Sequence, residues 1–325
     1  MTVFLIRRLM QSIVVLFVMS LLVFLGVFAI GNPIDILISP EATQIEIERA
    51  TIALGLDKPL WEQYGVFLSN ALLGDLGRSF VFNEPSIQII LQRLPATFEL
   101  TLVALLLTIV VGIPLGLWAG LRPHALSGKA IMAGSILGFS LPTFWIGLMM
   151  IMLFAVELKV LPSNGRGVPG EFLGFRSSLF TADGWAHIVM PATNLALVNI
   201  ALVIRLMRAG VREALLMDYV KFARAKGLAT RRVILVHVMK NIMIPVITVL
   251  GLEIGSLIAF AVVTETIFAW PGMGKLIIDS IYRLDRPVIV AYLMLTVFLV
   301  ILINLAVDIL YSVMDPRVRL QEPEA

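Results

Sequence analysis

Six long apolar windows constrain this chain more than any other feature. A helix needs about 20 apolar residues to cross a hydrocarbon layer roughly 30 Å thick. The windows that meet this length are Leu9–Ile30, Leu100–Leu121, Ala130–Val156, Ile188–Leu206, Ile242–Thr264 and Val288–Met314. Charged residues make up only 14% of the chain, against about 25% in an ordinary soluble domain. Because backbone polar groups in lipid must be satisfied internally, we predict an all-α membrane protein with six transmembrane helices.

The first window also has some features of a cleaved signal peptide. Arg7 and Arg8 precede it, and the small residues Ala29 and Gly31 stand near its end. Its apolar core of about 22 residues exceeds the 7 to 15 that are usual in a cleaved signal. We therefore expect residues 1–30 to form a retained transmembrane helix.

The distribution of Lys and Arg predicts the topology. Six spans place both termini on one side, together with the loops after the second and fourth spans. Lys and Arg are more than twice as dense on that side as on the other. The positive-inside rule assigns the denser side to the cytoplasm, so we expect cytoplasmic termini, including the tail 315–325.

The opposite side then carries residues 31–95 as an extracytoplasmic helical segment. Ser39 and Pro40 predict the start of one helix, which ends at Gly55, and a second is predicted from Pro59 to Gly74. We expect both to lie on the membrane surface or against the bundle. A purely structural cap remains an equal alternative.

Residues 205–240 form a basic cytoplasmic loop. They hold nine Lys or Arg and two acids. Tyr219–Lys226 predicts two helical turns with Val220, Ala223 and Ala225 as a small-residue face, and Gly227 suits a left-handed end. Thr230 is expected to cap the next helix. Small residues and cations together suit close docking on an acidic groove of another protein, although a basic helix lying on lipid remains an alternative.

Motifs for nucleotides and metals carry little weight. Residues 165–170 match the spacing GxGxxG, but they lie in an outer loop that contains Pro169 and has no βαβ unit around it, so we reject a dinucleotide site. The sequence has no GxxxxGK[ST] loop and no cysteine, and its three histidines are far apart. We expect no metal site, no cofactor bound by this chain, no catalytic residue and no nucleic-acid partner.

Acids inside the spans are candidates for a solute path. A charge at the centre of a bilayer costs about 2.5 to 3.5 kcal/mol, so such a side chain must face a cavity or a partner, or be protonated. Each of these acids is either part of a path or a buried structural carboxyl. The path candidates are Glu253, Glu99, Asn304, Asp308 and Glu265. Prolines within the windows, at 114, 142, 191 and 245, predict kinks or early turns.

Several short motifs stand in a characteristic order along the chain. They are Phe4–Leu9, Leu54–Leu60, Gly74–Ser79, Arg93–Leu100, Ser140–Trp145, Asp218–Gly227, Glu265–Gly274 and Met314–Arg317. With these motifs the chain resembles, nearly end to end, the permease subunits of bacterial ABC importers of the dipeptide, oligopeptide and nickel family, on the side of the "B" permeases. Two departures from the family pattern are Asn32, where Asp is usual, and the run Leu284–Pro287 before the last span, where the sequence Asp-Tyr-Pro is usual.

The resemblance implies a type I importer permease in the bacterial inner membrane. It implies that a coupling helix docks on an ATPase subunit through residues Glu213, Ala214, Asp218, Tyr219, Val220, Phe222, Ala223, Arg224, Ala225, Lys226 and Gly227. It also implies a sister permease in a heterodimer, two ATPase subunits that bind ATP and Mg, and an extracytoplasmic binding protein.

From the residues and the resemblance we expect an ATP-driven importer subunit, not itself an enzyme, for peptides or a related solute. The expected parts are the helix 1–30, the outer segment 31–95, a five-helix core 96–314 with the loop 205–240, and the tail 315–325. Nickel complexes, glutathione and opines are alternative solutes. A gradient-driven carrier that uses Glu253, or a scaffold without solute flux, are alternative functions.

Overall fold

A computed structural model describes residues 2–29, 43–53 and 56–314, and most of these residues are helical. The helices and strands are α1 (Thr2–Ala29), α3 (Gln44–Ala53), α4 (Leu60–Leu72), α5 (Ser86–Leu107), η1 (Thr108–Gly112), α6 (Ile113–Leu121), α7 (Leu126–Ser140), α8 (Thr143–Met150), η2 (Ile151–Glu157), β1 (Gly170–Phe172), β2 (Phe175–Ser177), η3 (Ser178–Phe180), α9 (Ala182–Ala214), α10 (Asp218–Ala225), α11 (Thr230–Arg232), η4 (Val233–Val238), α12 (Met239–Ile267), α13 (Met273–Tyr282) and α14 (Arg286–Met314). The predictions made for Asn32, Ser39, Pro40, Gly55 and the tail 315–325 lie outside the described residues.

Five of the six predicted spans are single helical stretches. They are residues 6–26, 86–121, 182–214, 230–267 and 286–309, and three of them are longer than 30 residues. The third predicted window is different, because α7 and α8 meet at an angle of 105°. Leu141 is extended at φ −85° and ψ 137°, and Pro142 precedes the first residue of α8. A proline disfavours helical geometry in the residue before it, so the predicted early turn at Pro142 is confirmed, whereas α9 and α12 continue through Pro191 and Pro245.

The described chain forms two units, Met1–Pro95 with Gly272–Leu302, and Ala96–Pro271 with Ile303–Ala325. Residues 272–302, which the sequence predicts as part of the 96–314 core, group with the N-terminal part of the chain in this division. Each unit has its own packing and is described by itself.

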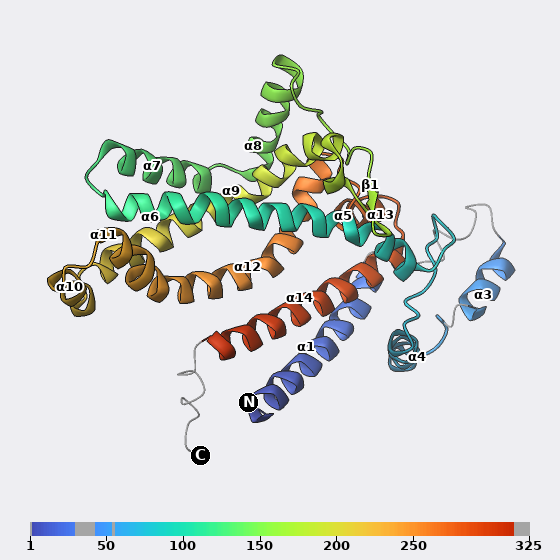
Figure 1. Ribbon diagram of the computed structural model, residues 1–325. Coiled ribbons are helices and arrows are strands. Elements are labelled where there is room, and N and C mark those ends of the chain that lie inside the picture. Colours follow the sequence, from blue (N-terminus) through green and yellow to red (C-terminus); the bar gives the residue numbers. More distant parts are fainter. Residues whose placement is uncertain (1, 30–42, 54–55, 315–325) are drawn as a thin grey trace. The chain divides into compact units, whose positions relative to one another are not determined.

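In the second unit α9 is the central helix, and α6, α7 and α12 pack against it. Figure 1 shows these four helices running alongside one another, with α10 and α11 at one end and the β1–β2 hairpin at the other. We call these the α10 end and the hairpin end.

Three glycines on η1 and α6 allow close packing on α9. A Cβ atom added at Gly116 would stand 2.5 Å from the Cβ of Met207, and one at Gly120 would stand 2.7 Å from the Cβ of Val211. At Gly112 the nearest atom would be a methyl group of Val203 at 3.0 Å. Glycine every fourth residue therefore meets an apolar side chain every fourth residue, as in close packing of transmembrane helices.

In the first unit α4 packs on α1 through aromatic rings. The Tyr64 ring meets those of Phe17 and Phe24 edge to face, and the Tyr64 hydroxyl lies 2.8 Å from that of Ser20. The predicted helix between Pro59 and Gly74 is confirmed, with Gly74 at φ +81° beyond its end. α3 begins after Thr43, which exchanges hydrogen bonds with Glu46 as in a capping box.

A buried carboxylate fixes the motif Gly74–Ser79 in this unit. Asp285 is fully buried just before α14, and it accepts hydrogen bonds from the Ser79 hydroxyl at 2.5 Å and the Phe80 amide at 3.0 Å. Gly77, at φ +87°, lies against Pro287. The run Leu284–Pro287, which departs from the usual Asp-Tyr-Pro, thus lies at a structural junction.

Candidate functional site

The α10 helix is short, basic and sharply ended. Its first turn contains Asp218 and its last contains Arg224, which complements the helix dipole. Gly227 has φ +73°, and its amide donates to the carbonyl of Arg224 at 2.9 Å while the Leu228 amide donates to that of Ala223 at 3.3 Å. These two bonds form a Schellman motif. The predicted left-handed end at Gly227 is confirmed.

One side of α10 is buried in its own chain. Val220 is 0% exposed and Ala223 is 5% exposed, in a cluster that includes Met207 and Val211 of α9 and Val246 of α12. An eight-residue helix is marginal alone and needs such packing. The prediction that Val220 and Ala223 face a partner protein is therefore wrong, and Ala214, also buried, belongs to the same cluster.

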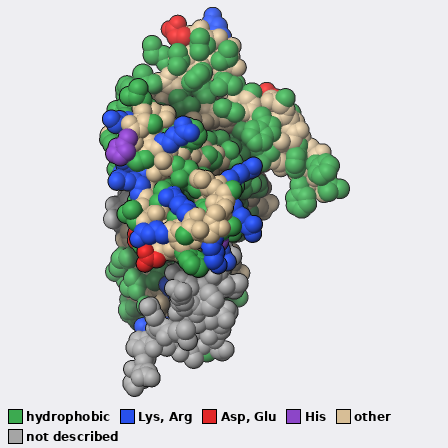
Figure 2. Space-filling view, turned by 60° about the vertical axis from the view of Figure 1, so that its left-hand side comes forward, with side chains coloured by type: hydrophobic (Ala, Val, Ile, Leu, Met, Phe, Trp, Pro, Cys, Tyr) green, Lys and Arg blue, Asp and Glu red, His purple; other side chains and the backbone are tan. Residues whose placement is uncertain are grey.

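The opposite side of α10 is exposed and basic. The residues of the predicted docking set that the structure exposes are Glu213, Asp218, Tyr219, Phe222, Arg224, Ala225, Lys226 and Gly227. The Phe222 side chain is 61% exposed, with the Lys226 ammonium 4.5 Å from its ring centroid. Figure 2 brings the α10 end forward and shows Lys and Arg side chains spread over it, with few carboxylates.

Two exposed apolar residues before α10 are not in the docking set predicted from the sequence. Leu216 is 74% exposed and Met217 is 41% exposed in the turn between α9 and α10. The sequence does contain a signal for them, because large apolar side chains are unusual in a basic loop that faces only water. Thr230 is not a cap, since Ala229 precedes α11 and the chain continues through η4 into α12.

At the hairpin end, Glu99 of α5 is paired and buried. Its exposed fraction is 8%. Arg166 donates to it from Nε at 2.9 Å and from Nη2 at 2.5 Å, and the Ser178 hydroxyl donates at 2.6 Å. This bidentate geometry is the strong form of an Arg–carboxylate pair. In this conformation Glu99 ties the loop around Arg166 to α5.

The glycine-rich loop 165–170 is held by two helices. The Gly165 amide donates to the carbonyl of Phe268, just after α12, at 3.0 Å, and the Val168 amide donates to the Asp183 carboxylate in the first turn of α9 at 2.7 Å. Gly167 has φ +71°, and a Cβ there would stand 2.7 Å from Asp183. The glycines therefore serve turn geometry and close packing.

Glu265 near the end of α12 is 0% exposed. It accepts a hydrogen bond from the Thr97 hydroxyl at 2.7 Å, and nearby the Trp270 indole donates to the carbonyl of Ala96 at 2.8 Å. Because Glu265 has no exposed surface, it cannot contact a solute in this conformation. The expectation that it lines a path is therefore not supported, and its visible role is to join α12 to α5.

The other path candidates do not come together at one place. Gly251 of α12 packs on Val307 of α14, where a Cβ would stand 2.6 Å away. Glu253 is two residues beyond Gly251, about 200° around the helix, so it lies on the face of α12 turned away from α14. Asp308 and Asn304 are neighbours of Val307 on α14, and all three polar side chains are half-buried.

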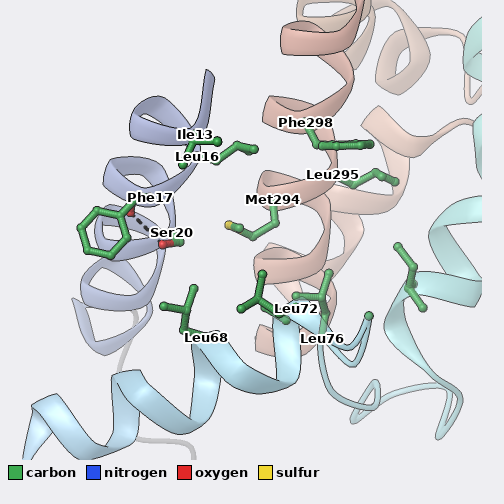
Figure 3. Close-up of a pocket in the computed structure, with 13 residues that line it drawn as sticks. Ile13, Leu16, Phe17, Ser20, Leu68, Leu72, Leu76, Met294, Leu295 and Phe298 are labelled. Carbon is green, nitrogen blue, oxygen red and sulfur yellow. Dashed lines mark hydrogen bonds between the residues drawn. The ribbon is translucent and has the colours of Figure 1, made fainter. Parts of the chain in front are cut away.

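A cavity of about 680 Å³ in the first unit does not fit a polar solute. It is lined by apolar side chains, most of them from α1, α4 and α14, and among its described lining residues Ser20 carries the one hydroxyl (Figure 3). Ser20 already donates to the carbonyl of Phe17 at 2.7 Å. A charged solute would lose its hydration there without gaining partners. Among the described residues no group of three or more His, Cys, Asp or Glu could hold a metal ion.

Comparison with known proteins gives a consistent result over the whole chain. Residues 112–320 match the family "Binding-protein-dependent transport system inner membrane component", and residues 1–101 match "Binding-prot-dependent transport system membrane comp, N-term". The dipeptide transport system permease protein DppB of Escherichia coli K12 is 38% identical, over 97% of this chain and 98% of its own. The glutathione transport system permease protein GsiC of Escherichia coli O6:H1 is 37% identical, over 97% and 98%.

A solved structure shares the fold. The inward-facing MetNI methionine ABC transporter contains a chain that superposes with a TM-score of 0.54 at 19% identity, and the match covers 71% of this chain and 99% of that one. At this identity the likeness concerns the fold alone.

Proposed function

Since the chain belongs to the family of binding-protein-dependent transport system inner membrane components, we propose that it carries short peptides or peptide-like solutes. The chain is the transmembrane permease subunit of an ATP-driven importer and a multi-pass protein of the bacterial inner membrane. The observation that carries the solute class is the end-to-end similarity to dipeptide and glutathione permeases. Glutathione is a tripeptide, so both relatives point to a solute with peptide bonds and charged ends.

The family works with ATPase and substrate-binding partners. We infer a sister permease beside this chain, two ATPase subunits that bind ATP and Mg, and a binding protein that delivers the solute from outside. The sequence itself has no phosphate-binding loop, so the energy for transport comes from the ATPase subunits. We place the α10 end in the cytoplasm and the hairpin end outside, which the density of Lys and Arg supports.

Phe222 is the proposed contact point on α10. It is a large, exposed aromatic side chain with cations around it, and aromatic residues that fill a partner's pocket often dominate binding energy. Lys221 and Asp218 pair with each other at 2.8 Å with both side chains well exposed, so this pair contributes little by itself. We infer that Phe222 enters an ATPase groove and that Arg224 and Lys226 meet acids at its rim.

The buried side of α10 makes it a suitable transmitter of force. Val220 and Ala223 lie in one core cluster with residues of α9 and α12. A well-packed core moves as a unit because its interior is dense. A push on Phe222 would therefore reach both long helices, rather than being lost in a loop.

Docking is tested with two Phe→Ala variants. Phe222→Ala is expected to weaken binding of the purified ATPase subunits to the permease in nanodiscs by about 30-fold, the equivalent of a hot spot near 2 kcal/mol. Phe260→Ala is the matched control, because Phe260 is 70% exposed on the span of α12. Unchanged affinity for Phe222→Ala, or an equal loss for both variants, would contradict the docking proposal.

The solute class needs a separate experiment. The complete importer in proteoliposomes, with its binding protein outside and ATP inside, should take up a labelled dipeptide, and unlabelled dipeptides should compete more strongly than nickel or free amino acids. Uptake of nickel alone would exclude the peptide proposal while leaving the docking result intact. Uptake that needs a proton gradient but no ATPase subunit would instead support a carrier based on Glu253.

A further inference from the structure

Three arginines form a stripe near the α10 end of α9. Arg205, Arg208 and Arg212 are spaced by three and four residues, so they lie within about 60° of one another around the helix. None of the three forms an ion pair with a residue that the structure describes. The buried Nε atoms of Arg205 and Arg208 have no hydrogen-bond partner in the described part of the chain. These are charged donors that lack an acceptor.

The depth of the stripe follows from helix length. Trp185, in the first turns of α9, is 45% exposed and donates from its indole to the carbonyl of Leu179, a position typical of the aromatic belt at a membrane surface. Arg205 is twenty residues further, which is about 30 Å along a helix and equals the hydrocarbon thickness. Arg208 and Arg212 therefore reach into the headgroup layer at the α10 end.

Neighbouring helices shape this position. The Arg205 guanidinium lies 4.4 Å from the centroid of the Phe139 ring on α7, and that of Arg122 lies 4.4 Å from the Trp118 ring at the end of α6. Arg208 is backed by α6, since its Cα would be 3.3 Å from a Cβ at Gly120. Stacking on the Phe139 ring holds the Arg205 guanidinium in place. Because the Nε atoms of Arg205 and Arg208 are buried, it is the Nη atoms that can donate to an acceptor outside the chain.

We propose that the stripe Arg205, Arg208 and Arg212 binds the phosphate of an anionic phospholipid in the leaflet at the α10 end. Guanidinium groups match phosphate oxygens in a bidentate way. Beside the stripe, Phe139 of α7 is 52% exposed, and its ring, which lies against Arg205, offers an apolar surface to the acyl chains. A soluble phosphate has the same phosphate chemistry but cannot use that surface, and a soluble acidic protein cannot reach Arg205 at the hydrocarbon boundary.

The proposal is tested by native mass spectrometry of the full-length chain, released from detergent and titrated with phosphatidylglycerol or phosphatidylcholine. Phosphatidylglycerol should bind about tenfold more tightly, and Arg208→Gln should remove most of this preference. Arg231→Gln, an exposed cation on α11 outside the stripe, is the matched control and should change the affinity less than twofold. The exposed Arg212→Gln is a second variant with a smaller expected loss, useful if Arg208→Gln does not fold.

Three results would overturn the proposal. Equal losses for Arg208→Gln and Arg231→Gln would mean a diffuse charge effect without a site. Equal binding of the two lipids would mean that the net negative charge of the headgroup is not recognised. Displacement of phosphatidylglycerol by millimolar inorganic phosphate would assign the stripe to a soluble anion instead of a lipid.

Discussion

The ion pair between Glu99 and Arg166 gives the sharpest test of how the hairpin end is built. Both side chains are largely buried, with 10% and 18% of their side-chain surfaces exposed. Removing one partner of such a pair leaves a buried charge without compensation, which typically costs 3 to 5 kcal/mol, whereas removing both costs much less. Ser178 still donates to Glu99 after Arg166 is lost, so we take the lower value, about 3 kcal/mol, for Arg166→Gln.

Hydrogen exchange at the loop amides measures this locally. The Gly165 and Val168 amides are bonded to Phe268 and Asp183, and they exchange when the loop opens. A loss of about 3 kcal/mol corresponds to exchange faster by roughly 100-fold in Arg166→Gln. The double variant Glu99→Gln with Arg166→Gln should exchange more slowly than Arg166→Gln alone. The reasoning would be refuted if these amides exchanged less than threefold faster in Arg166→Gln. It would also be refuted if the double variant exchanged faster than Arg166→Gln alone.

Three further predictions concern positions where the backbone is closely constrained. Gly116→Ala should lower the melting temperature of the chain in detergent, because its new Cβ would stand 2.5 Å from Met207 and overpacking costs about 1 to 3 kcal/mol; Gly134→Ala, with open space around it, should leave it unchanged or raised. Gly227→Ala should speed exchange of the Leu228 amide about fivefold, since a left-handed conformation costs an alanine about 1 kcal/mol. Asp285→Ala removes the acceptor for the Phe80 amide, and exchange there should rise about tenfold.

Much of the fold can be predicted from local signals in the sequence. Apolar length alone located the spans, and the proline at 142 gave the break between α7 and α8. Gly227 and the helix after Pro59 were predicted from end signals. The glycines at 112, 116 and 120 carry a signal of the same kind, a four-residue repeat facing α9, which a search for small residues in the spans would have found.

The site was harder to predict, because burial depends on partners far away in the sequence. Val220 and Ala223 look like a docking face on an isolated helix, and only the packing of α9 and α12 shows that this face is already occupied. Glu265 resembles a path carboxylate until Thr97, 168 positions earlier, is placed beside it. Arg166 lies in the glycine-rich run 165–170, and no local pattern there predicts its pairing with Glu99.

The two ends of the second unit are joined by the same two helices. α9 ends and α12 begins at the core cluster beneath α10. At 1.5 Å per residue, α9 is about 50 Å long and α12 about 43 Å long. The loop that carries Arg166 is fastened to both of them, to α9 through Asp183 and to Phe268 beyond α12. If α9 and α12 shift relative to each other, this loop must move, and the pair with Glu99 on α5 must stretch or break. We therefore expect the Arg166–Glu99 pair to respond to motion that starts at α10, although no residue of α10 lies near it.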